Sequence, residues 1–133
     1  VLFRHASERY RAMLHAADDD VALLLLEHEA FGVSHDALGA ALCETWGLAA
    51  PAVSSVRYHV MVNATLQLPM QLPRRSICAL SALAYALMTD PDALDVVAEK
   101  VAPQADLDPT LVLRGARKVQ EQIENAVARE RVT

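Results

Sequence analysis

Five histidines are the residues of this sequence best suited to bind a metal ion. They are His5, His15, His28, His35 and His59. Stable metal sites use three or four protein ligands, and helical sites often pair two histidines four residues apart. No histidine has that spacing, and the only adjacent His-Asp pair is His35-Asp36, where the aspartate lies at a helix start. His35 and His59 fall on consecutive predicted helices and could meet, whereas the other three are expected to be surface or boundary residues.

Nucleophilic side chains lack the surroundings that covalent catalysis requires. The serines in the middle of the chain lie in predicted helices rather than in a Gly-x-Ser-x-Gly turn. The four glycines are too far apart to form a phosphate-binding loop. Cys43 and Cys78 lie in apolar helical segments and are predicted to be reduced core residues of a cytoplasmic protein. We therefore expect no catalytic residue, no cofactor and no metal, and a protein that is not an enzyme.

Charge and hydropathy exclude two classes of partner. The chain carries 12 basic and 17 acidic residues, a net charge of −5, whereas nucleic-acid binding usually needs a basic surface. The longest leucine run, residues 23–26, is far shorter than the ~20 apolar residues that span a bilayer. The first residues, from Val1 onward, lack the order of a signal peptide. We predict neither a nucleic acid nor a membrane as partner.

The elements that position these side chains are predicted to be helices. Aromatic residues make up only 5% of the chain while Ala and Leu are abundant, and this composition favours helices over strands. Apolar spacing, caps and prolines predict an all-α, compact bundle of about seven helices in one domain over residues 1–133. The predicted helices cover residues 6–17, 20–31, 35–46, 51–60, 74–89 and 91–101, and about 20 residues from 109.

Several residues are predicted to start, end or closely pack these helices. The run Asp18-Asp19-Asp20 is expected to cap the second helix rather than bind a cation, and Gly32 to end it. Ser34 is expected to cap the third helix. Gly39 lies inside that helix, where it would allow a neighbouring helix to approach closely.

Apolar stripes predict which helix faces form the core. Leu38, Leu42 and Trp46 are expected to pack against the 53–60 helix, which directs Val53, Val56 and Val60 inward and Arg57 outward. On the fifth helix, the predicted core face is Ile77, Leu80, Ala84 and Leu87, with Met88. On the last helix it is Val112, Ala116, Val119, Ile123 and Ala126. This last stripe is expected to pack on its own domain rather than in a coiled coil, and a homodimer through it stays open.

A segment of about thirty residues resembles the central motif of HDOD domains. It runs from Glu27-His28-Glu29-Ala30-Phe31-Gly32-Val33-Ser34-His35 through Leu38-Gly39-Ala40-Ala41-Leu42 and Trp46-Gly47-Leu48 to Val56-Arg57-Tyr58-His59. The segments Glu8-Arg9-Tyr10 and Ala79 to Ala86 are similar to the regions on either side. Two positions depart from the pattern, because Val60 replaces the second histidine of a pair and Ala49 replaces a proline.

The resemblance implies an HD-domain-like fold and a non-catalytic regulatory role in bacterial signal transduction. HDOD domains are relatives of HD phosphohydrolases without the metal-binding His-Asp motif. The resemblance therefore implies that Glu27, Gly32, His35, Gly39, Trp46 and His59 are family-motif residues with structural roles. It also implies that the chain is the C-terminal part of such a domain, without its N-terminal helices. His35 and His59 match positions that are metal ligands in the active relatives.

We therefore expect a cytoplasmic output domain, of the response-regulator type found in two-component systems, that binds a protein partner or a neighbouring signalling domain. The alternative is a metal-dependent HD-superfamily phosphohydrolase whose remaining ligands lie on an N-terminal part outside this chain. A helical DNA-binding domain is disfavoured by the net charge.

Overall fold

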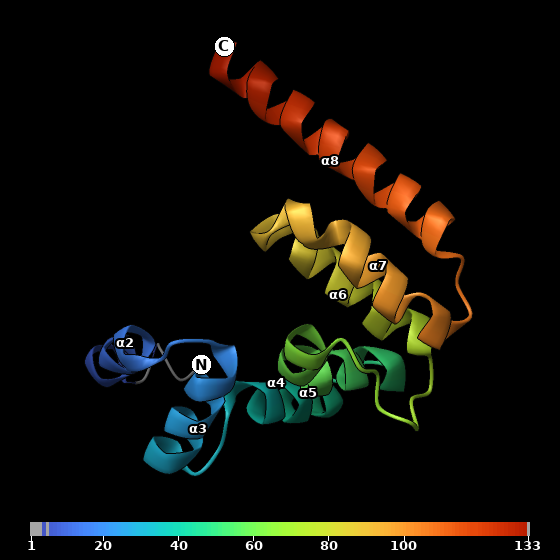
Figure 1. The fold of residues 1–133 in the computed structure, drawn as a ribbon. Helices are drawn as coiled ribbons and strands as arrows, with labels where there is room; N and C mark the ends of the chain where they lie inside the picture. Colours follow the sequence, from blue (N-terminus) through green and yellow to red (C-terminus); the bar gives the residue numbers. More distant parts are fainter. Residues whose placement is uncertain (1–3, 5, 133) are drawn as a thin grey trace.

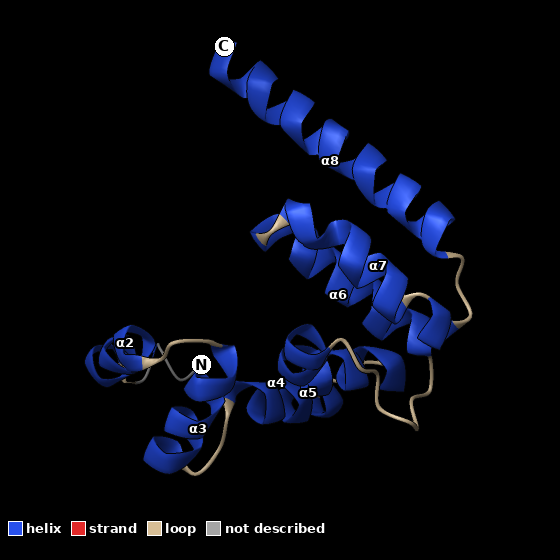
Figure 2. Cartoon of the chain, viewed as in Figure 1, coloured by secondary structure: helices blue, strands red, loops and turns tan. Residues whose placement is uncertain are grey.

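Every regular element is helical in the part of the chain that the computed structural model describes, residues 4 and 6–132 (Figures 1 and 2). The prediction of an all-α bundle of about seven helices is confirmed. His5 lies outside the described residues. The elements in chain order are α2 (Ser7–Ala16), α3 (Asp20–Phe31), α4 (His35–Thr45), α5 (Ala50–Thr65), α6 (Arg75–Thr89), the 3-10 turn η1 (Pro91–Ala93), α7 (Leu94–Val101), the 3-10 turn η2 (Pro103–Ala105) and α8 (Pro109–Val132).

Each helix packs mainly on its neighbours in sequence. The most extensive contacts join α4 to α5 and α5 to α6, followed by α6 with α7 and α7 with α8. Smaller contacts hold α3 against α2, α4 and α5. Figure 1 shows the resulting order in space, with α2 and α3 at one side, α4 and α5 next to them, α6 and α7 beyond, and α8 outermost.

Two of the predicted helix-capping interactions are present in the structure, and a third is replaced by a different hydrogen bond. The Asp19 carboxylate accepts a hydrogen bond of 2.7 Å from the amide of Ala22, which caps α3 as expected. Gly32 ends α3 in the left-handed region, at φ 74°. Ser34 does precede α4, but its hydroxyl binds the side chain of Asp36 instead of capping the backbone.

The main core lies between the end of α5, α6 and α7. The predicted core face of α6 is largely wrong, because Ile77, Leu80 and Met88 are exposed by 36%, 48% and 81%, and of that face Leu87 alone packs against the core. The buried face is Cys78, Ala79, Ala82, Leu83 and Ala86. Both faces of α6 are apolar, so spacing alone could not select one. The face rich in alanine is buried because small side chains let α5 and α7 approach closely.

One of the two cysteines belongs to that core. Cys78 is buried and Cys43 is half-buried, and neither forms a disulfide. Burial raises the pKa of the Cys78 thiol, an effect that the nearby Arg75 guanidinium opposes. The expectation of two reduced core cysteines therefore holds fully for Cys78 and partly for Cys43.

The contact between α4 and α5 is centred on small residues rather than on Trp46. A Cβ atom added to Gly39 would lie 3.1 Å from Cγ1 of Val56, which confirms the predicted close approach. Ala40 of α4 and Val60 of α5 are both buried. Trp46 is 70% exposed, so its predicted place in the core is wrong. α4 ends at Thr45, and its C-cap Trp46 therefore lies beyond the packed part of the helix.

Leu38 and Leu42 are half-buried, so the predicted core stripe of α4 is also only partly correct. Val53 and Val56 of α5 are half-buried as well, and Arg57 is exposed as expected.

The last helix packs on the bundle over its first half only. Val112 and Ala116 are half-buried, whereas Val119 and Ile123 are exposed by 44% and 48%, and every residue from 121 through 132 is exposed. Figure 1 shows α8 diverging from α6 and α7 toward its C-terminal end. The prediction that the whole stripe, including Ala126, packs on its own domain is therefore wrong for its second half. The helix is too long for the elements beneath it.

Two polar side chains hold the connector between α5 and α6 in place through hydrogen bonds. The Gln104 amide accepts a hydrogen bond from the amide of Leu68 and donates to the carbonyls of Leu66 and Lys100, each at 2.8 Å. Arg75 donates to the carbonyl of Gln104 at 2.6 Å and to carbonyls within the connector. None of the described helices combines the length and apolar character needed to cross a bilayer.

Candidate functional site

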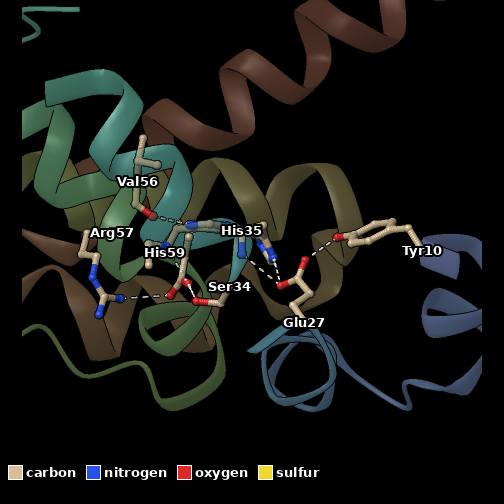
Figure 3. A network of polar contacts seen from close by, with 9 residues as sticks. Tyr10, Glu27, Ser34, His35, Val56, Arg57 and His59 are labelled. Atoms are coloured by element: carbon tan, nitrogen blue, oxygen red, sulfur yellow. Dashed lines mark hydrogen bonds and ion pairs between the residues drawn. The ribbon is translucent and has the colours of Figure 1, made fainter. Parts of the chain in front are cut away.

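The centre of the candidate site is Glu27, a fully buried carboxylate on α3 (Figure 3). It lies one helical turn after Leu23, on the buried face of α3. The Tyr10 hydroxyl of α2 donates to Glu27 Oε2 at 2.5 Å, and the His35 backbone amide donates to Oε1 at 3.1 Å. His35 Nδ1 lies 2.7 Å from the same Oε1. A buried carboxylate needs such partners because its desolvation is costly.

His35 and His59, which the sequence suggested could meet, are brought together. The rings of His35, at the start of α4, and His59, on α5, lie edge to face with centroids 5.3 Å apart. His59 Nδ1 is 2.6 Å from the backbone carbonyl of Val56. A carbonyl can only accept, so His59 carries a proton on Nδ1. His35 Nδ1 faces the Glu27 carboxylate and is likewise a donor.

A second buried carboxylate, Asp36, follows His35 at the start of α4. Its side chain accepts hydrogen bonds from the Ser34 hydroxyl and, at 2.7 Å, from the amide of Ala37. Arg57 of α5 adds an ion pair, with Nη1 3.2 Å from Asp36 Oδ2. Asp36 thus joins the start of α4 to α5. Its predicted position at the helix start is correct, and its burial was not foreseen.

This network changes the pKa of Tyr10. Burial raises the pKa of the Tyr10 phenol above its ordinary value of 10.0, and the hydrogen bond to Glu27 raises it further. An ionised phenol would face the Glu27 carboxylate directly, so Tyr10 remains a hydrogen-bond donor at neutral pH. The Tyr10 hydroxyl therefore acts as a hydrogen-bond donor and not as a base.

The residues predicted as motif residues divide into three groups. Glu27, His35 and His59 form the network just described, and Gly32 and Gly39 serve the backbone as a left-handed C-cap and a close helix contact. Trp46 is exposed at the end of α4 and takes no part in the network. Sequence reasoning missed Tyr10, Asp36 and Arg57 as members. A signal existed for Glu27, since an acidic residue four positions after Leu23 shares its buried face.

A separate cavity of about 380 Å³ lies between α3, α5 and α6. Its polar lining includes Asp19, Asp20, Asn63 and Tyr85. The Tyr85 hydroxyl donates to Asp20 at 3.0 Å, and this bond, with burial, raises the pKa of Tyr85. None of the residues singled out as family-motif residues lines this cavity.

Every member of the Glu27 network lies within the first 60 residues of the chain. A scan against protein-family models finds the HDOD domain there. Residues 1–62 match the HDOD domain family. The match covers α2 to α4 and most of α5, and with them every member of the Glu27 network, whereas α6, α7 and α8 lie outside the matched residues. No curated protein and no solved structure matches the chain significantly.

The HDOD segment, residues 1–62, therefore combines two buried acidic residues and two adjacent histidines. Its polar atoms are well satisfied, because no buried side-chain nitrogen or oxygen of the described residues lacks a hydrogen-bond partner. No group of three or more His, Cys, Asp or Glu side chains is arranged to hold a metal ion within residues 4 and 6–132.

Proposed function

We propose that this chain is a non-enzymatic regulatory module of a bacterial signalling protein. It acts by contact with a protein partner or with a neighbouring signalling domain, in the manner of a response-regulator output domain located in the cytoplasm. Two features support the proposal. The HDOD match covers residues 1–62, and that family is of a non-catalytic type. The buried carboxylates Glu27 and Asp36 are both engaged by neighbouring donors.

The single observation that carries this proposal is the bonding of Glu27. Its two oxygens accept from Tyr10 and from both the ring and the backbone of His35. A general base must be free to accept a proton from a substrate, and a metal ligand must offer a lone pair to the ion. Glu27 instead joins α2, α3 and the start of α4, which is a structural role.

The surface offers features suited to protein contact. Trp46 and Leu48, between α4 and α5, are exposed by 70% and 50%. Exposed aromatic side chains are frequent anchors of protein interfaces. A partner that binds at this loop would contact the HDOD segment directly.

A second candidate is metal-dependent phosphohydrolysis, and the two histidines are the observation that favours it. Metal-binding histidines usually donate one ring nitrogen to a carboxylate or a backbone carbonyl and bind the ion with the other. His35 and His59 have that arrangement at Nδ1, with Glu27 and the Val56 carbonyl as acceptors. Their Nε2 atoms could therefore serve as two ligands of a larger site.

Elemental analysis and a hydrolysis assay distinguish the two candidates. The chain is purified without an affinity tag, and the substrate is bis(p-nitrophenyl) phosphate with added manganese, iron or zinc. The regulatory proposal predicts no stoichiometric metal and no hydrolysis above background. Bound metal and hydrolysis that disappear in the His35→Ala/His59→Ala variant, but persist in the matched His15→Ala/His28→Ala variant, would overturn it. His15 and His28 are exposed and lie outside the network.

A further inference from the structure

An apolar groove runs between α6 and the first half of α8. Its volume is about 360 Å³, and it is lined by Leu80, Leu83, Ala84, Leu87, Val112, Gly115, Ala116 and Val119. The floor includes three small residues, Ala84, Gly115 and Ala116. A Cβ atom added to Gly115 would meet no heavy atom within 4 Å, so there is open space above that glycine. The groove is therefore both apolar and unfilled.

The second half of α8 carries the complementary feature. Ile123 and Val127 are exposed by 48% and 42% on a segment whose residues are all exposed from 121 through 132. Isolated helices shorter than about 12–15 residues are marginal in water. A helical segment of this length is therefore expected to need packing contacts for its stability. The apolar side chains of this segment continue the stripe that lines the groove, because Val112, Ala116, Val119 and Ile123 are spaced four and three residues apart.

The accessible surface area of the whole chain is larger than that expected for a folded monomer of the same mass. Its accessible area is 8889 Å², whereas a folded monomer of 14.5 kDa is expected to expose roughly 6,900 Å². The difference exceeds the ~800 Å² that each partner contributes to a standard interface. The chain as a whole therefore exposes enough surface for an interface of standard size, and the groove and the exposed half of α8 are an apolar part of that surface.

We propose that two copies of this chain associate through α8, with the two helices antiparallel and each C-terminal half lying over the groove of the other copy. The heptad spacing of α8 is compatible with an antiparallel pairing in which the two helices cross near residue 121. Ile123 then lies opposite the partner's Val119, and Ala126 lies opposite the partner's Ala116. This proposal is independent of the regulatory function proposed above.

The shapes of the opposed side chains agree with that register. Val127 lies opposite the partner's Gly115, so a large side chain meets the open space of the groove. Gln120 and Gln122 flank the centre of the contact, and the charged Glu130 lies near its end, opposite the partner's Val112. Arg117 lies on another side of the helix, where it pairs with Asp95 at 3.1 Å. Isologous contacts of this kind are the commonest way in which identical chains assemble.

Sedimentation equilibrium of the intact 133-residue chain tests the proposal. A mass that rises with concentration toward twice 14.5 kDa is expected. Ile123→Glu places a charge in both halves of the contact and should weaken dimerisation at least tenfold. Ala128→Glu adds the same charge on the outer side of α8 and should change the dissociation constant less than twofold. A chain that stays monomeric at every concentration, or a dimer that Ile123→Glu leaves intact, would overturn the proposal.

Two further variants separate loss of the dimer from loss of folding. Gly115→Lys fills the groove and improves helix propensity, so it should abolish the dimer while leaving helicity and monomer stability intact. Gln122→Cys places thiols from the two copies close to the symmetry axis and should yield a covalent dimer on mild oxidation. Ala128→Cys, which keeps the same native cysteines, should not. Equal cross-linking of both cysteine variants would contradict the antiparallel register.

Discussion

Replacing Glu27 with alanine should lower the free energy of unfolding by about 2–4 kcal/mol. The substitution removes the acceptor of the Tyr10 hydroxyl, the His35 amide and the His35 ring. A buried donor that loses its acceptor typically costs about 1–3 kcal/mol. The total stays below the sum for the three donors because 33% of the His35 side chain is exposed, so water can replace part of the lost bonding.

The expected shift in melting temperature follows from the size of the chain. The unfolding entropy is about 2.1 cal/mol/K per residue, so 133 residues convert that loss to a decrease of roughly 7–14 °C. Glu27→Gln keeps one carbonyl acceptor and should cost about half as much.

Urea unfolding followed by circular dichroism at 222 nm gives the free energies. Glu29→Ala is the matched control, because Glu29 lies on the same helix and is exposed; it should change stability by less than about 0.5 kcal/mol. If Glu27→Ala and Glu29→Ala were equally mild, Glu27 could not be the residue that joins α2, α3 and α4.

Three further predictions concern single positions. Because the pKa of Tyr10 is raised above 10.0, the native state holds the phenol proton more tightly than the unfolded chain, and this stabilisation is complete below about pH 10 and lost as the pH rises further. Tyr10→Phe should therefore reduce the loss of stability above pH 10 in urea titrations, and an unchanged loss would exclude Tyr10 as its source. Gly39→Val should cost about 1–3 kcal/mol because the added atoms meet Val56, and a Val56→Ala background should recover part of that loss; strict additivity of the two changes would refute the contact. Trp46→Ala should cost less than about 1 kcal/mol, and the fluorescence of this sole tryptophan should be readily quenched by acrylamide; a cost above about 2 kcal/mol would show that the side chain is packed.

The helices could be predicted from the sequence because their boundaries depend on local chemistry. Asp19 and Gly32 act within one turn of the chain, and their roles are visible in the residues themselves. Burial depends instead on which elements meet. α6 has two apolar faces, so only the approach of α5 and α7 decides that Ala79 is buried and Leu80 is exposed.

The candidate site was predictable to a similar extent. The meeting of His35 and His59 followed from their places on consecutive helices. The hydrogen bond between Tyr10 and Glu27 joins residues 17 positions apart on different helices. No local sequence pattern predicts such a contact. Trp46 was misplaced because a large apolar residue at helical spacing normally packs inward, whereas α4 ends one residue before it.

The succession of contacts from one helix to the next has a consequence for how the chain reaches its native state. Because most contacts join neighbouring helices, loop closure costs little entropy, and proteins of this kind fold in about microseconds to milliseconds. The bond from Tyr85 to Asp20 spans 65 residues and is among the contacts that should form late. In the monomer, the end of α8, residues 121–132, all of them exposed, should open and close independently of the core. Its amide hydrogens should therefore exchange first, long before those of α6 and α7.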